Sequence, residues 1–148
     1  MNKLVRIPPP IIALLLLTLA FAADRNVPDL PPAKLPATGL VLMAVGFALA
    51  LSALQNFLRL RTTVIPDGEP AALATQGPYG WTRNPMYLGL STALLGLAFY
   101  FGRAPLFFVP LLLFFILGRA HIGLEEATLG RLFGAEYDEY RRRVGRWL

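Results

Sequence analysis

Two polar stretches carry the residues whose types and spacing could do chemistry. The first is "GPYGWTRNPMYLGL", Gly77 to Leu90, which holds one arginine, one asparagine, two prolines and three aromatic residues. Pro85 directly follows Arg83 and Asn84, and this order predicts the first turn of a helix, where the N–H that proline lacks would be unpaired anyway. The remaining free N–H groups of such a turn favour a carboxylate or another ligand rich in hydrogen-bond acceptors.

The second stretch surrounds the only histidine of the chain. His121 and Glu125 are four residues apart, so a helix would place them on one face, with Glu126 on the adjacent face. Neighbouring carboxylates at a membrane surface are costly to bury unpaired. We therefore expect the two glutamates to meet basic side chains or a cationic ligand.

Each of these residues also has a purely structural explanation. Arg83 fits the excess of basic residues beside cytoplasmic helix ends, and Tyr79, Trp81 and Tyr87 fit the aromatic belt of a membrane protein. His121 could be a capping or snorkelling residue, and the glutamates could simply open an amphipathic helix.

Composition excludes several kinds of site. The absence of cysteine excludes disulfides, thiolate metal sites and a cysteine nucleophile, and a single histidine excludes a multi-histidine metal site, so we expect no bound metal. Ser52 and Ser91 lie in hydrophobic segments without a base nearby in sequence, and no glycine-rich turn between a strand and a helix indicates a Rossmann domain. The net charge of +5 comes from segment ends and the tail rather than from a basic stripe, so we expect no nucleic-acid partner.

The positioning elements are hydrophobic helices. The chain has 148 residues, 55% of them hydrophobic and 16% charged, and a mean hydropathy of +0.54, which is typical of membrane proteins. Because apolar segments are spread along the whole length, we predict an all-α, polytopic integral membrane protein with a single domain over residues 1–148. Spans of about 20 apolar residues are predicted at residues 8–23, 37–58, 85–101 and 105–124.

Two connecting regions and the first span need separate comment. A basic start, a short apolar run and the ending Ala20-Phe21-Ala22 also fit a signal peptide, but we favour a retained first helix because further spans follow. The proline-rich residues 24–37 are expected to be non-helical, and the sequence "GRAP", residues 102–105, predicts a tight hairpin.

Orientation follows from the distribution of the basic residues. Eleven of them fall on one side of the predicted bundle and three, Arg25, Lys34 and Arg103, on the other. The positive-inside rule then places both termini and the loop of residues 59–84 in the cytoplasm. The segments that hold the candidate site, residues 71–87 and 121–147, would share that face.

The last segment has a helical pattern of its own. Leu129, Leu132, Phe133 and Tyr137 recur at three- and four-residue spacing, and Tyr140 extends the stripe. This pattern predicts one amphipathic helix at the membrane interface, which could serve as a surface anchor without any catalytic role.

Together the two polar stretches resemble a known family. "LATQGPYGWTRNPMYLG" resembles the L-x-T-x-G-x-Y-x-x-x-R-[HN]-P-x-Y-x-G motif of the isoprenylcysteine carboxyl methyltransferase family and its bacterial relatives. "EEATLGRLFGAEYDEYRRRVGRW" is similar to the closing E-E-x-x-L-x-x-x-F-G-x-x-Y-x-x-Y-x-x-x-V motif of that family. The resemblance covers residues 61–147, with both motifs in order around one helical hairpin. The phospholipid N-methyltransferases are more distant kin that share the N-P-M-Y core and the paired glutamates.

The resemblance implies a polytopic helical enzyme that uses S-adenosylmethionine without a Rossmann fold. By similarity, the cofactor pocket would be lined by Leu73, Tyr79, Asn84, Pro85, Met86, Tyr87 and Glu125, with Glu126 as the second of the paired glutamates. The prenylcysteine enzymes have an arginine in place of His121 and usually a histidine in place of Asn84. Both departures leave methyl transfer in place and concern the acceptor.

We assign roles on this basis as hypotheses. Arg83 would bind a carboxylate of the acceptor or of the cofactor's methionine part, Glu125 would bind the cofactor's ribose or ammonium group, and His121 would contact the acceptor. A carboxylate acceptor is ionised at neutral pH and needs no general base. An amine acceptor must lose a proton, for which His121 or Glu126 is the nearest candidate.

Three functions follow from these residues. The first is methyl transfer to a prenylated or similar lipid-like acceptor, most like prenylcysteine carboxyl O-methylation. The second is N-methylation of a phospholipid or another lipid amine. The third is a non-catalytic small membrane protein that binds a lipid or a partner.

Overall fold

The computed structural model describes residues 7–25, 27, 34–60 and 70–148. These residues form six α-helices and one 3₁₀ turn, and none of them lies in a strand. In chain order the elements are α1 (Pro9–Asp24), α2 (Pro36–Leu60), η2 (Gly77–Gly80), α3 (Pro85–Phe101), α4 (Ala104–Ala120), α5 (Ile122–Phe133) and α6 (Ala135–Arg143). The predicted all-α class is thus confirmed for the described part of the chain.

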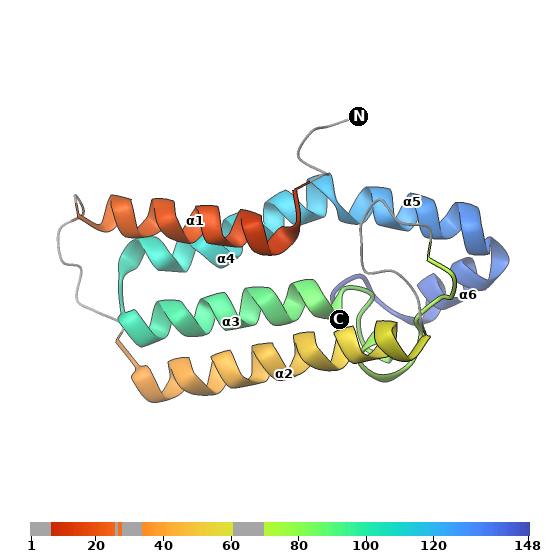
Figure 1. The fold of residues 1–148 in the computed structure, drawn as a ribbon, viewed down its shortest axis with the longest axis horizontal. Helices are drawn as coiled ribbons and strands as arrows, with labels where there is room; N and C mark the ends of the chain where they lie inside the picture. The colour runs from red at the N-terminus through yellow and green to blue at the C-terminus, as the bar shows by residue number, and fades with distance from the viewer. Residues whose placement is uncertain (1–6, 26, 28–33, 61–69) are drawn as a thin grey trace.

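Four apolar helices lie side by side along the long axis of the molecule (Figure 1). α2 packs on α3, α3 on α4, and α4 on α1, so the spatial order differs from the chain order. The buried side chains between α1, α3 and α4 form the largest apolar core, which consists of Ile12, Ala13, Ala20, Leu94, Ala98, Leu106, Val109, Leu113 and Leu117. α5 continues beyond α4, and α6 folds back at the same end of the molecule (Figure 1).

Glycine lets the backbones of α2 and α3 touch. A Cβ added to Gly46 would lie 2.5 Å from both the carbonyl oxygen of Gly89 and the backbone nitrogen of Ala93. About two turns earlier in α2, a Cβ on Gly39 would lie 2.7 Å from the carbonyl oxygen of Gly96. Such close approach increases van der Waals contact, which is the main attraction between helices in lipid. α3, which carries part of the polar site, is therefore held rigidly against α2.

The predicted hairpin between the third and fourth segments is confirmed. α3 ends at Phe101, and Gly102 takes a left-handed conformation with φ 67°, which glycine adopts without steric cost. α4 begins two residues later, at Ala104.

The helices occupy the predicted spans with small shifts at their ends. Two stretches, Pro36–Leu60 and the nearly continuous Ala104–Phe133, are long and apolar enough to cross a membrane, whereas α1 and α3 are shorter apolar helices. At about 1.5 Å per residue, the 17 residues of α3 rise about 25 Å, less than the about 30 Å of a hydrocarbon core. Crossing by all four helices thus stays a prediction, and most of the proline-rich connection before α2 lies outside the described residues.

The prediction of one amphipathic helix after the fourth span is wrong. Gly134, with φ 49° and ψ −120°, ends α5 and precedes α6, so two helices replace the single one. Four of the five residues of the predicted stripe still meet, because Leu129 and Phe133 of α5 pack on a cluster that contains Tyr137 and Tyr140 of α6. The turn brings the stripe together across two helices instead of along one.

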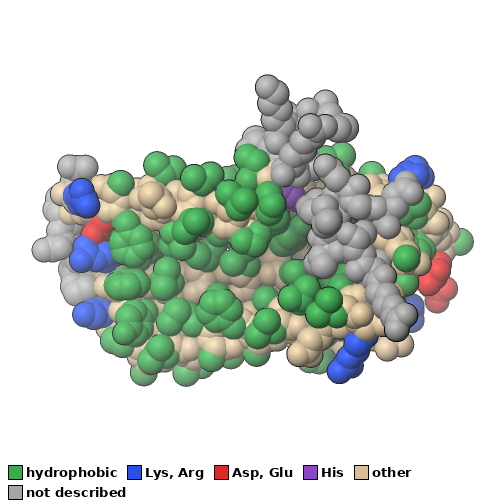
Figure 2. Space-filling model, viewed as in Figure 1, with side chains coloured by type: hydrophobic (Ala, Val, Ile, Leu, Met, Phe, Trp, Pro, Cys, Tyr) green, Lys and Arg blue, Asp and Glu red, His purple; other side chains and the backbone are tan. Residues whose placement is uncertain are grey.

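The surface of the four helices is apolar. Figure 2 shows hydrophobic side chains spread over the visible face of the bundle and charged side chains towards its two ends. Large exposed examples are Leu14, Val41, Leu58 and Phe115. So extensive an exposed apolar surface suits contact with lipid.

Replacing Gly46 with alanine should separate α2 from α3, because the new methyl group would overlap backbone atoms that cannot rotate away. We expect the free energy of unfolding to fall by about 1–3 kcal/mol, the usual effect of overpacking. Thermal unfolding in detergent, followed by circular dichroism, measures the change.

Gly118→Ala is the matched control, since nothing lies within 4 Å of a Cβ at that helical position. It should leave stability unchanged or raise it by up to about 1 kcal/mol. Equal melting temperatures for the two variants would contradict the proposed backbone contact.

Candidate functional site

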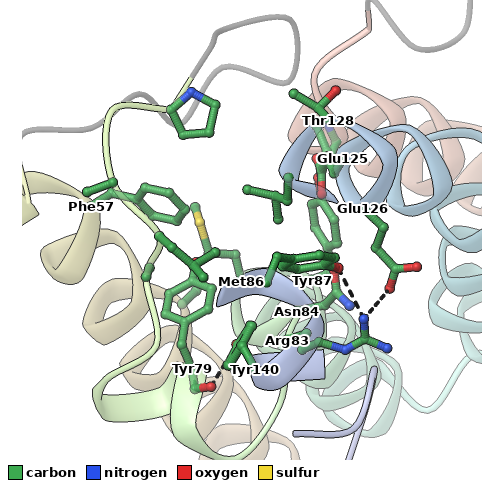
Figure 3. A pocket seen from close by; sticks show the side chains of 18 of the residues that line it. Phe57, Tyr79, Arg83, Asn84, Met86, Tyr87, Glu125, Glu126, Thr128 and Tyr140 are labelled. Carbon is green, nitrogen blue, oxygen red and sulfur yellow. Dashed lines mark hydrogen bonds and ion pairs between the residues drawn. The ribbon is translucent and has the colours of Figure 1, made fainter. Parts of the chain in front are cut away.

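A pocket of about 500 Å³ lies where the segment around η2, the start of α3 and the helices α5 and α6 meet (Figure 3). Eight of the ten predicted site residues line it: Leu73, Tyr79, Arg83, Asn84, Met86, Tyr87, Glu125 and Glu126. The structure thus brings together the two polar stretches that the sequence separates.

One polar contact in the pocket joins α3 to α5. The hydroxyl group of Tyr87, in the first turn of α3, donates a hydrogen bond to Oε1 of Glu125, in the first turn of α5. No arginine or lysine of the described residues forms an ion pair with Glu125. Its carboxylate is therefore held by a neutral donor rather than by a basic side chain of the described residues.

The second glutamate has the opposite surroundings. Oε1 of Glu126 lies 3.0 Å from an Nη of Arg83 (Figure 3). The same Nη donates to the Tyr137 hydroxyl over 3.1 Å. Arg146 approaches the same carboxylate with two nitrogens, Nε at 2.9 Å from Oε1 and an Nη at 2.5 Å from Oε2. Nε of Arg83 is buried and has no partner among the described residues.

The chain before α3 is fixed by the tail that follows α6. The N–H of Arg83 donates to the carbonyl oxygen of Gly145 over 3.0 Å. The carbonyl oxygen of Arg146 accepts from Thr82 Oγ1 at 3.1 Å and from Asn84 Nδ2 at 2.9 Å. Asn84 is the N-cap residue of α3, but its side chain makes no capping hydrogen bond; its amide nitrogen donates to the tail instead.

Aromatic side chains form the wall near η2. The ring of Phe57, at the end of α2, packs edge-on against Tyr79 with 5.4 Å between ring centroids. The hydroxyl of Tyr140 donates to the carbonyl oxygen of Tyr79 over 2.8 Å. Burial is the main cause that raises the pKa of Tyr140 to about 12, so this phenol stays protonated and remains a donor at neutral pH.

The remaining walls are apolar. Pro8, Pro9 and Pro10 line the pocket from the start of α1, and Leu90 and Leu129 line it from α3 and α5. The cavity therefore combines a large apolar lining with a few convergent polar groups, the usual character of a small-molecule site.

Two predicted residues lie elsewhere. Pro85 is buried at the first position of α3, where it starts the helix, and does not line the pocket. His121 is fully buried at the break between α4 and α5, and its Nε2 lies 3.1 Å from the carbonyl oxygen of Ile7. That oxygen can only accept, so Nε2 carries the proton. His121 therefore lies outside the lining of the pocket, with its ring against the carbonyl oxygen of Ile7.

Sequence reasoning missed several contributors, among them Thr82, Tyr137, Gly145 and Arg146 at the polar end and Phe57 and Tyr140 in the aromatic wall. In the sequence, Tyr137 was assigned only to the apolar stripe of the predicted amphipathic helix, and Arg146 was used only as one of the basic residues that indicate orientation. The closing motif, which runs through the tail, was the available signal that this segment returns to the site.

A comparison with protein families matches residues 35–136 to the phospholipid methyltransferase family. This region holds α2 to α5 and most of the lining of the pocket, and it amounts to more than half of the chain. No curated protein and no solved structure matches the chain. The match supports the broader family of membrane methyltransferases. It does not identify the chain as a prenylcysteine carboxyl methyltransferase, and it does not identify the acceptor. With its apolar helices and this match, the chain belongs to the phospholipid methyltransferase family of membrane methyltransferases.

Proposed function

We propose that the protein transfers a methyl group from S-adenosylmethionine to an amphiphilic acceptor that enters from the membrane. The observation that carries the proposal is the pocket itself, in which a charged end and extended apolar walls meet at one end of four apolar helices. A soluble cofactor and a lipid-like acceptor could both reach such a place.

The residues of the pocket fit the cofactor. A volume of about 500 Å³ lies within the about 300–1,000 Å³ usual for small-molecule sites. Glu125 offers a carboxylate without a basic partner among the described residues, which suits an ammonium or ribose hydroxyl group. The buried, unpartnered Nε of Arg83 suits a carboxylate. Tyr79, Met86 and Leu73 supply apolar surface for a flat base.

When bound, the cofactor would supply a methyl group on a positively charged sulfur, which is already activated for displacement. The contribution of the protein is then orientation and electrostatics. Tyr87 fixes Glu125, Glu126 and Tyr137 fix Arg83, and the proline and aromatic walls give the space between them an apolar lining.

Two acceptor classes remain. A carboxylate like that of a prenylcysteine would be ionised and could be bound by Arg83, so the reaction would need no base. A lipid amine, which the description of the matching family favours, would have to lose a proton to Glu126, the nearer of the two predicted bases, because His121 lies outside the pocket.

We also infer that the pocket faces the cytoplasm. The end of the bundle with the pocket carries Arg59, Arg83 and Arg119, and the opposite end carries Arg25, Lys34 and Arg103. With the arginines of α6 and the tail added, the basic excess lies at the pocket end, and the positive-inside rule turns that end inward.

Replacing Glu125 with glutamine should weaken binding of S-adenosylmethionine at least about tenfold, since a charge-assisted contact with a buried carboxylate is lost. Isothermal titration calorimetry in detergent measures the dissociation constant. Glu136→Gln, on the exposed face of α6, is the control and should bind as the wild type does. No binding by the wild type at millimolar cofactor would overturn the methyltransferase proposal and favour a non-catalytic protein.

The acceptor class can be read from the product. Membranes that contain the protein, incubated with cofactor labelled in its methyl group, should transfer label to a lipid-extractable product. Label released by mild base as methanol identifies a carboxyl methyl ester, and label that stays on a non-volatile amine after the same treatment identifies N-methylation. Membranes with the Glu125→Gln variant should give little label, and equal labelling by both would show that the pocket is not the site of transfer.

A further inference from the structure

The tail of residues 144–147 crosses the charged end of the pocket and contacts three helices or their leading segments. Its main chain accepts hydrogen bonds from the segment before α3: Gly145 from the N–H of Arg83, and Arg146 from Thr82 and Asn84. Its Arg146 side chain binds Glu126 of α5. The tail is thus attached to both polar stretches at once.

The next residue attaches the tail to α4. The ring of Trp147 stacks on Phe114, with 4.1 Å between ring centroids and 28° between ring planes. Trp147 is half-buried, whereas Trp81 is 72% exposed. These are the only two tryptophans of the chain, so tryptophan fluorescence can report whether the tail is docked.

Arg146 does not line the pocket but determines what two lining residues present to it. Its guanidinium binds both carboxylate oxygens of Glu126, which fixes the plane of that carboxylate. Arg83 contacts Glu126 through one Nη only, and its buried Nε has no partner among the described residues and is open to a ligand.

The main chain of the same residue acts on Asn84. A carbonyl oxygen only accepts, so Arg146 takes the Nδ2 group of Asn84 and leaves Oδ1, an acceptor, for a ligand. One tail residue therefore sets the orientation of an amide and of a carboxylate that stand on either side of Arg83.

We propose that Arg146 is a positioning residue of the pocket: docking of the tail holds Asn84, Glu126 and Arg83 in the arrangement that binds S-adenosylmethionine. This inference rests on the proposed function. The side chain of Arg146 is 45% exposed, and exposed ion pairs contribute little to folding. Loss of Arg146 should therefore weaken ligand binding far more than it lowers stability, which separates positioning from a general structural role.

The test uses a Trp81→Phe background, in which Trp147 is the only tryptophan. In this background Arg146→Gln should increase quenching of Trp147 by acrylamide and raise the dissociation constant for S-adenosylmethionine about tenfold or more. The melting temperature should change by no more than a few degrees. Arg142→Gln, an exposed arginine of α6, is the control and should change none of the three readouts.

Arg146→Lys supplies the graded comparison and serves if the glutamine variant does not fold. Lysine keeps the charge but cannot bind both carboxylate oxygens in the guanidinium geometry, so its dissociation constant should lie between those of the other two proteins.

The outcomes are distinct. If Arg146→Gln binds the cofactor with wild-type affinity, the inference is overturned and the proposed function stands. This holds whether acrylamide quenching shows the tail to be released or still docked. A loss of binding that only accompanies a large fall in melting temperature would also overturn it. Failure of the wild type itself to bind the cofactor would instead overturn the proposed function.

Discussion

The carboxylate of Glu126 is the point on which the polar end of this structure depends. It lies on α5 beside apolar helices, where a buried carboxylate without counter-charges is strongly unfavourable. Two arginines satisfy it, one before α3 and one in the tail after α6, so a single carboxylate joins three segments that are distant in sequence. The side chains of Glu126 and Arg83 are 17% and 12% exposed, which makes this ion pair stronger than one on an open surface. The neighbouring Glu125 has no basic partner among the described residues and accepts only from the Tyr87 hydroxyl, so the two adjacent glutamates present different surroundings to the pocket.

The apolar part of the molecule supplies the rigidity that such a network needs. Because the hydrophobic effect gives little attraction between helices within lipid, α2 and α3 associate through close backbone contact at glycine. The polar residues Arg83 and Asn84 directly precede α3, and Phe57, in the last turn of α2, packs on Tyr79. Asn56, one residue earlier, donates to the carbonyl oxygen of Gln76 over 3.3 Å. The glycine contact therefore fixes the end of α2 relative to the start of α3, which form two walls of the pocket.

Much of this arrangement could be predicted from residue types and spacing. The Asn84-Pro85 pair marks the start of α3, and Gly102 marks its end, because both depend on local backbone preferences. The glycines at the helix contact recur seven residues apart in both helices, a signal present in the sequence but not used. The partner of Glu126 could not be found in this way, because Arg146 lies 20 residues further along and reaches it only through the turn at Gly134. The surroundings of His121 could not be found by periodicity either, because the carbonyl oxygen that its ring contacts, that of Ile7, lies 114 residues earlier in the chain.

The central claim is that the charged end of the pocket binds S-adenosylmethionine. Hydrogen–deuterium exchange of the protein in lipid nanodiscs, with and without saturating cofactor, tests it without any assumption about the acceptor. We expect slower exchange in residues 73–87 and 123–140, which carry the lining groups, and no change in the middle of α2, around Met43. Unchanged exchange in both lining segments, or protection confined to other parts of the chain, would contradict the account.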